Sequence, residues 1–185
     1  MKNLRAGKDS EFFQQGLTEV FKKCNSFLKK DGVLVFTFHH RDEEAWSTIF
    51  KSIIDSGFYV SVTYPVYSEM AISVHIKGQE AVKYDTIVVC RRRNGNTPAP
   101  LSWGLLVETV LKHVSKMVKV LGGEGITLTL SDIKNLAYAK LLELYTKHYP
   151  YIHRNGGQVS FEAALRELKG LMINSCLVLP RTPIA

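Results

Sequence analysis

The sequence has few cysteines, and they are too far apart to build a zinc ribbon. Its three cysteines are Cys24, Cys90 and Cys176, and no two of them form a Cys-x-x-Cys pair. Structural zinc sites of the ribbon type take their ligands from such closely spaced pairs. Cys24 and Cys90 each lie in an apolar pattern, which is typical of buried cysteines that act as small hydrophobic side chains.

Long hydrophobic runs are also missing. No apolar stretch comes near the roughly 20 residues that a transmembrane helix needs, and the first residues, MKNLRAGKDSEFF, lack the apolar core of a secretory signal peptide. We therefore expect a cytoplasmic protein with no membrane partner. With 185 residues, of which 45% are hydrophobic and 22% charged, the chain has an ordinary globular composition. Its length suggests one domain, with or without a small appendage.

Motifs for nucleotide binding, acyl transfer and metal binding are absent as well. The glycine cluster LGGEGITL follows a helical pattern rather than a strand, so we interpret it as a connector. There is no Pro-Pro pair and no evident Ser-His-Asp arrangement. The adjacent His39 and His40 are unsuited to a metal site, because neighbouring strand residues point to opposite faces and no carboxylate spacing completes a site.

Positive charge is what the sequence has in excess. The formal net charge is +7, spread over both halves, with local clusters at Lys22 and Lys23, at Lys29 and Lys30, and at Arg91 to Arg93. This balance permits a nucleic-acid partner without requiring one. The commoner outcome for such clusters is a solvated surface.

Hydrophobic periodicity predicts an α/β fold in the first half of the chain. Helices are expected over Ser10 to Lys30, with Asp9 or Ser10 as the cap, and from Asp42 to Gly57. Strands are expected at Val33 to Phe38, Phe58 to Val66 and Tyr84 to Cys90.

The order of these elements predicts how the strands run. The first strand is apolar on both faces, which fits a strand buried between two helical layers. A strand, helix and strand crossover makes the first two strands parallel. No clear helix precedes the third strand, so we expect it to return antiparallel beside the others.

A linker and three helices are predicted in the second half. NGNTPAP, residues 94–100, is the clearest linker. Helical patterns follow at Ser102 to Leu121, at Ser131 to His148 with Ser131 as the cap, and at Ser160 to Asn174. The predicted organisation is an α/β domain over 1–93, a linker over 94–100 and an α-helical C-terminal extension over 101–185.

The first predicted strand raises a problem of coverage. It is apolar enough to be central, yet no segment before it in this sequence is suited to pair with its other edge. A long apolar edge strand promotes aggregation unless something covers it. Three alternatives stay open: another chain covers the edge, the C-terminal helices fold back over it, or the chain is a piece of a larger domain.

Several stretches resemble a known enzyme family. LKKDGVLVFTFHH, then EEAW…SGFYV, then YDTIVVCRR resemble the C-terminal half of class I S-adenosylmethionine-dependent methyltransferases. The resemblance is to the adenine-specific DNA methylase-like family, whose larger members often carry a zinc ribbon. TLSDIKNLAYAKLLELYTKHYP and NGGQVSFEAAL also look like that family, so the resemblance covers most of the chain. FTFHH followed by EAW is its most specific part.

The resemblance implies a fold and a cofactor. It implies a partial Rossmann-like methyltransferase sheet that contains the last three of seven strands, with the final strand antiparallel. It also implies that the Gly-x-Gly cofactor loop, the acidic residue for the ribose and the Asp/Asn-Pro-Pro-aromatic motif belong upstream of residue 1. We therefore expect S-adenosylmethionine to be the cofactor of the complete family enzyme, and we expect this chain alone not to bind it.

Candidate binding residues lie at the ends of strands. Ligands of open α/β sheets bind outside the carboxyl ends of the strands, where His39, His40 and Arg41 lie. The resemblance implies that they form a substrate-side wall, and we predict no catalytic residue and no metal ligand in this chain. The other candidates are phosphate contacts, at Lys83, Arg91, Arg92 and Arg93.

Each candidate also has a plain structural interpretation. One histidine hydrogen-bonds to local backbone and the other is solvated, Arg41 pairs with Glu43 or Glu44, and the remaining cations lie on a solvated rim. Trp46 occurs at helical spacing and is predicted to be a core residue rather than a platform for stacking a base.

Three functions remain open. The chain is a fragment or split part of a DNA adenine-N6 methyltransferase that is inactive alone, a non-catalytic nucleic-acid-binding domain of the same ancestry, or a structural partner that completes another protein's sheet. The partners expected are DNA and either a separate chain with the N-terminal methyltransferase half or a second copy joined through the edge of strand 33–38.

Overall fold

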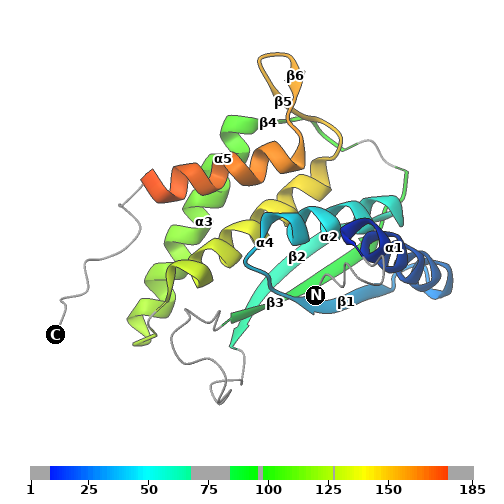
Figure 1. Ribbon diagram of the computed structural model, residues 1–185, viewed down its shortest axis with the longest axis horizontal. Coiled ribbons are helices and arrows are strands. Elements are labelled where there is room, and N and C mark those ends of the chain that lie inside the picture. The colour runs from blue at the N-terminus through cyan, green and yellow to red at the C-terminus, as the bar shows by residue number, and fades with distance from the viewer. Residues whose placement is uncertain (1–8, 68–83, 96–97, 127, 175–185) are drawn as a thin grey trace.

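The computed structural model describes residues 9–67, 84–95, 98–126 and 128–174. Figure 1 shows α1 and α2 over one face of a three-stranded sheet, with α4 beside β2 and with α3 and α5 packed against α4. The elements of the first part are α1 (Ser10–Phe27), β1 (Val33–Phe38), α2 (Glu43–Asp55), β2 (Phe58–Tyr67) and β3 (Tyr84–Arg92). Those of the second part are β4 (Leu101–Ser102), α3 (Trp103–Gly123), α4 (Leu130–His148), β5 (Ile152–Arg154), β6 (Gly157–Gln158) and α5 (Phe161–Asn174).

The main sheet has the order β1-β3-β2, and β3 runs antiparallel to both of its neighbours. β1 and β2 are therefore parallel to each other, as the crossover predicted, although β3 separates them. The predicted antiparallel return of the third strand is also confirmed. A second small sheet joins β4, β5 and β6. The fold is mixed α/β, with two small sheets and five helices among the described residues.

Local capping explains where the helices begin and end. The Asp9 carboxylate accepts a hydrogen bond from the Phe12 backbone N–H at 2.9 Å, which confirms one of the two predicted caps of α1. Gly57, at a φ of +80°, stops α2 in the left-handed conformation that glycine adopts most easily. The cap of α4 is Thr129 rather than the predicted Ser131. Thr129 forms a reciprocal capping box with Asp132, which satisfies two helix-end N–H groups at once.

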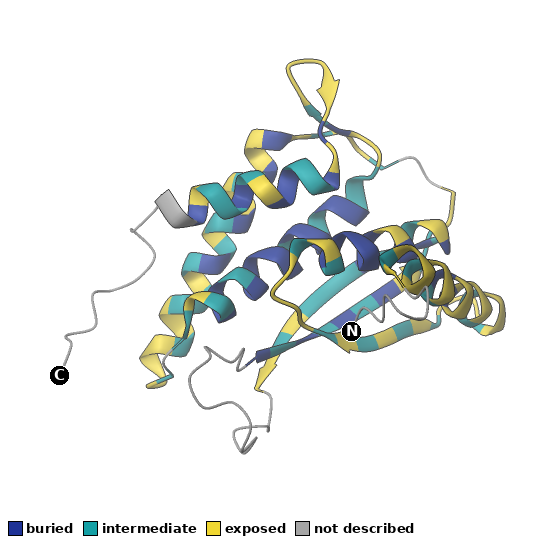
Figure 2. Ribbon diagram, viewed as in Figure 1, coloured by how far each residue is buried: buried dark blue, intermediate teal, exposed yellow. Residues whose placement is uncertain are grey.

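Among the described residues, helices cover only one face of the sheet. Phe36 and Phe38 of β1 contact Phe21 of α1 and Trp46 of α2, with ring centroids 5.2 and 4.9 Å apart. On the opposite face, Val35 is 52% exposed. Figure 2 shows the resulting alternation along β1. The prediction of a strand buried between two helical layers is therefore wrong, because helical cover reaches only the Phe36 side of β1.

One hydrophobic core joins both predicted domains. The helical extension packs its apolar side chains against α2 and the covered sheet face, and the two parts contribute to a single cluster. The largest fully buried side chains are Trp46, Tyr138, Tyr145, Phe58, Phe161, Ile53, Leu106, Leu141, Leu142, Ile152, Leu165 and Leu168. The predicted linker thus separates two kinds of architecture within one packed body.

The two outer edges of the main sheet differ. Side chains of α4 satisfy the edge of β2: the Val60 N–H donates to Thr146 Oγ1 at 2.9 Å, and the Thr63 N–H donates to Glu143 Oε2 at 3.1 Å. No described strand pairs with the outer edge of β1. Of the three alternatives for covering that edge, a return of the described C-terminal helices does not occur, because they pack at β2 instead.

Candidate functional site

The candidate site begins where β1 ends. His39 lies on the uncovered side of the sheet, and its Nδ1 contacts the Asp85 carboxylate near the start of β3. The side chains of His39 and Asp85 are 45% and 26% exposed, so the pair is open to solvent. Asp85 was not predicted, because only the pairing register of β1 and β3 brings it to the carboxyl end of β1.

His40 is held by three hydrogen bonds, two through its backbone and one through its ring. Its N–H donates to Asn135 Oδ1 of α4 at 3.3 Å, and its carbonyl accepts from Trp46 Nε1 at 2.9 Å. The ring Nδ1 accepts from the Asp42 backbone N–H at 3.0 Å. In the neutral ring the proton therefore lies on Nε2, which is left as the donor for an external partner. Of the two histidines, His40 is the one whose ring bonds to local backbone.

Side chains of α4 and α5 contact Glu43, the first residue of α2, which lies close to His40 and Arg41 in the sequence. The Glu43 Oε1 atom accepts from the Tyr138 hydroxyl at 3.4 Å and pairs with Lys169 Nζ at 2.7 Å. Burial, followed by the adjacent Glu43 carboxylate, raises the pKa of Tyr138. The Tyr138 hydroxyl therefore stays protonated at physiological pH. Arg41 itself is exposed.

The predicted arginine cluster lies at the other end of the sheet. Arg91 is paired with Val33, the first residue of β1, whereas His39 follows the last residue of that strand. Six strand residues span about 20 Å, so the predicted site residues fall into two separate groups. Lys83 lies outside the described residues.

Two of the three arginines bind helix C-termini. Arg92 Nη2 donates to the carbonyl of Leu28 at 2.8 Å, just beyond α1, and also to that of Asn25. Arg93 donates to the carbonyls of Thr146 and Tyr149 at the end of α4. Cations at a helix C-terminus satisfy carbonyls that have no partner within the helix. Arg91, which is exposed, is thus the arginine best placed to meet an external anion.

The different roles of these arginines predict different effects on stability. Arg92→Met should lower the free energy of unfolding by about 1.5–3 kcal/mol, the usual contribution of hydrogen bonds from a charged group. Arg91→Met is the matched control, and its effect should stay within about 0.5 kcal/mol. Urea unfolding followed by circular dichroism measures both. Equal effects for the two variants would contradict the assignment of Arg92 to the end of α1.

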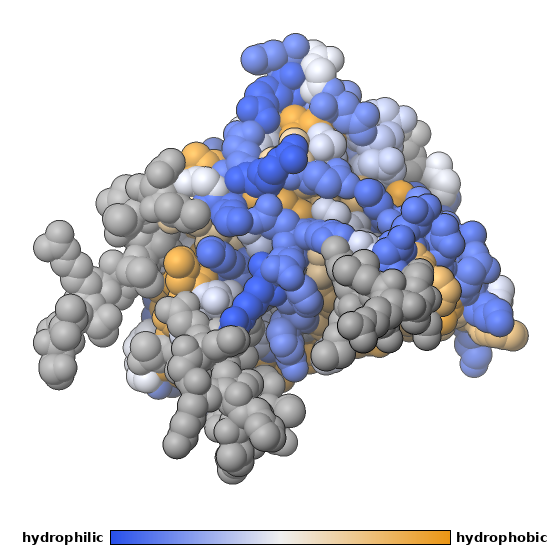
Figure 3. Space-filling model, viewed as in Figure 1, coloured by the Kyte–Doolittle hydropathy of each residue, from blue (hydrophilic) through white to orange (hydrophobic). Residues whose placement is uncertain are grey.

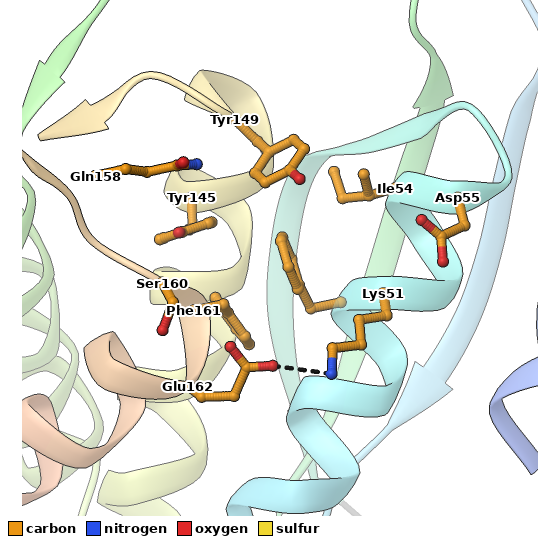
Figure 4. A pocket seen from close by; sticks show the side chains of 10 residues that line it. Lys51, Ile54, Asp55, Tyr145, Tyr149, Gln158, Ser160, Phe161 and Glu162 are labelled. Carbon is orange, nitrogen blue, oxygen red and sulfur yellow. Dashed lines mark ion pairs between the residues drawn. The ribbon is translucent and has the colours of Figure 1, made fainter. Parts of the chain in front are cut away.

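A cavity of about 280 Å³ lies elsewhere, between α2, the end of α4 and the start of α5. Its floor is aromatic, and the rings of Phe50 and Phe161 stack there with centroids 4.4 Å apart. Figure 4 shows the ion pair that Lys51 forms with Glu162 at 3.1 Å beside this floor. None of the predicted site residues lines this cavity. The rings of its floor pack against one another, so the cavity is a depression over the core.

Neither a metal site nor a known family is indicated. Within the described ranges, no group of three His, Cys, Asp or Glu side chains is arranged to hold a metal ion. Among the same residues, no helix combines the length and the apolar character needed to cross a bilayer. No protein-family model matches the sequence, and neither a curated protein nor a solved structure matches it.

Proposed function

We propose that this chain is a fragment or split part of a class I S-adenosylmethionine-dependent DNA methyltransferase of the adenine-N6 type, and that it forms the substrate side while the methyl-donor site lies outside these residues. The observation that carries the proposal is the position of His39, His40 and Arg41. These residues follow the carboxyl end of β1, a strand with one partly buried face. They lie directly beside the outer edge of β1, which has no described partner strand. The antiparallel final strand agrees with the sheet that the sequence resemblance implies.

The chemistry of amino-group methylation divides between the two parts. The donor methyl group has to be held in line with the exocyclic nitrogen, and the target base has to leave the duplex stack. In this chain, His40 Nε2 and the solvent-open His39 and Asp85 pair offer hydrogen bonds to an extruded base or to a flanking phosphate. Their role is to position the substrate.

We expect S-adenosylmethionine to bind outside the described residues. Glycines with a positive φ, which a tight cofactor loop needs, occur at Gly57, Gly95, Gly125 and Gly156. None of these adjoins the carboxyl end of β1, and Gly57 precedes β2 at the opposite end of the sheet. Isothermal titration of the purified chain with S-adenosylmethionine should therefore give no measurable heat of binding. Saturable one-to-one binding would contradict the proposal that the methyl-donor site lies outside these residues.

Reconstitution tests the proposed activity directly. The chain is mixed with the N-terminal half of an adenine-N6 methyltransferase, and transfer of a radiolabelled methyl group to an adenine-containing duplex is followed. We expect activity only from the mixture, and we expect His39→Ala to lower kcat/KM about tenfold through loss of substrate positioning. Leu105→Glu, an exposed change on α3, should leave the rate unchanged. A mixture as inactive as its separate components would count against the proposal.

A second candidate function is nucleic-acid binding without chemistry, and the net charge of +7 favours it. Binding to a duplex would then weaken steeply with salt, and Arg91→Gln would reduce the slope of log K against log salt by about one. Fluorescence anisotropy between low and physiological salt measures this slope. A binding constant that is independent of salt would remove this candidate.

A further inference from the structure

The outer edge of β1 is flanked by exposed apolar surface on both sides. On the helical side, Phe13, Val20 and Phe27 occur at every seventh residue of α1 and are 59%, 54% and 86% exposed. Such spacing places them along one stripe of the helix. Figure 3 shows hydrophobic side chains at the surface in the region where Figure 1 places α1 and β1.

A groove connects this stripe to the strand. It has a volume of about 420 Å³ and runs between α1 and the beginning of β1. Its lining is almost wholly apolar, with one charged side chain: Val20, Lys23, Cys24, Phe27, Leu28, Val33 and Leu34. Val33 and Leu34 belong to β1, whose outer edge has no described partner strand, so the groove adjoins that edge.

The second flank is the uncovered face of the sheet. Val35 of β1 is 52% exposed there, and Tyr64 and Val66 of β2 are 53% and 37% exposed. The register places Val89 beside Val35 and Ile87 beside Tyr64, so the apolar surface crosses all three strands. Large contiguous apolar surfaces of this kind mark interaction sites in folded proteins.

We propose that the edge of β1, with the α1 stripe on one side and the bare sheet face on the other, is a docking surface for a second protein chain of α/β architecture. That partner adds a strand to β1, lays one helix along the α1 stripe and covers the sheet face with another. The surface follows from the exposures and the topology. The identity of the partner as the methyl-donor half rests on the function proposed above.

Symmetry favours this partner over a second copy of the chain. A two-fold axis perpendicular to the sheet joins two β1 edges and the two α1 stripes, but it leaves both sheet faces bare. A two-fold axis in the plane of the sheet covers the faces and leaves the edges open. A single layered α/β partner covers the edge and both flanks at once.

The charged residues around the groove and the start of β1 indicate which charges the partner carries. Lys23 lines the groove, Lys29 and Lys30 are exposed just before β1, and Arg91 lies beside the first residue of that strand. Asp31, which follows Lys30 in the sequence, is an exposed acidic residue beside this group. The rim is therefore basic, and we expect acidic side chains around the strand that the partner contributes.

Co-expression tests the surface independently of catalysis. The full chain of 185 residues is produced with a tagged N-terminal half of an adenine-N6 methyltransferase that ends after its fourth strand, and light scattering gives the mass of the purified complex. We expect a one-to-one complex. Val35→Lys and Phe27→Glu should each weaken it at least tenfold, since one change charges the sheet face and the other charges the stripe. Both side chains are exposed, so circular dichroism should show unchanged folding.

The controls separate the possible outcomes. Leu105→Glu places the same kind of charge on an exposed residue of α3 and should leave the complex intact. A complex that forms but transfers no methyl group supports the docking surface and removes the proposed function. A monodisperse homodimer of the chain alone that Val35→Lys dissociates would overturn the proposal, as would failure of the folded wild-type chain to bind the methyltransferase half.

Discussion

Replacing Trp46 with alanine should lower the free energy of unfolding by about 3–5 kcal/mol, the usual cost of emptying a fully buried large aromatic site. Trp46 is fully buried, and its ring packs edge-on against Phe38 of β1 and Tyr138 of α4, at centroid distances of 4.9 and 5.8 Å. One side chain thus joins the sheet, α2 and the helical extension. Urea unfolding gives the difference, and a loss below about 1 kcal/mol would show that the two parts of the chain are not joined there.

Trp46→Phe separates packing from hydrogen bonding. Phenylalanine keeps most of the ring contacts but loses the indole N–H that donates to the His40 carbonyl at 2.9 Å. We expect about 1 kcal/mol of destabilisation from the lost bond. The imidazole resonances of His40 should also shift in a proton NMR spectrum, because the bond fixes the backbone on which that ring is mounted. Unchanged resonances would mean that Trp46 does not position the candidate site.

Glu143→Leu should destabilise the fold by about 3 kcal/mol, near the lower end of the range for breaking a buried charged pair. The Glu143 side chain is 5% exposed and pairs with both Lys140 and Lys147 at 2.8 Å. It also accepts from the N–H and the hydroxyl of Thr63 at the edge of β2. Leucine leaves that edge N–H without its acceptor. The lower end of the range applies because both lysines stay partly exposed and regain water. Thermal or urea unfolding at neutral pH measures the loss.

The contribution of Glu143 should depend on pH. Burial alone would raise the pKa of Glu143, but hydrogen bonds and charges from Lys140 and Lys147 outweigh it and lower the pKa. A lowered pKa adds stability above the unfolded value of about 4.3, and this stability is lost as the pH falls through the folded value. The gap in stability between the wild type and Glu143→Gln should therefore be largest near neutral pH and close in acid. A gap that widens on acidification would contradict the sign of the shift.

Local sequence was sufficient wherever a short-range interaction decided the structure. Asp9 caps the start of α1 and Gly57 stops α2, as their side-chain and backbone chemistry predicted. Trp46 is in the core, as its helical spacing indicated. The prediction that Ser131 caps α4 was wrong. Thr129 prevails over Ser131 because Asp132 lies three residues after it and completes the capping box, a signal already present in the sequence.

Only some residues of the candidate site could be predicted from the sequence. His39, His40 and Arg41 were recognised because they follow an apolar strand, and the structure places them at its carboxyl end. Asp85 joins His39 only through the register of β3, and Asn135 reaches His40 from a helix 95 positions away in the sequence. Arg92 and Arg93 were candidates for phosphate contacts, yet their guanidinium groups reach helix C-termini that tertiary packing brings within range.

The sequence by itself determined the five helices, the three strands of the main sheet, their order and the antiparallel return of the last of these strands, because periodicity, caps and connection length are local properties of the chain. It did not reveal the short strands β4, β5 and β6. The tertiary structure alone decided which apolar surfaces are buried. An apolar run such as Val33 to Phe38 shows that both of its faces are suited to burial, but it does not reveal how many layers are available to cover them. Here helices cover one face of β1, α4 closes the edge of β2, and the other face and edge of β1 are left exposed.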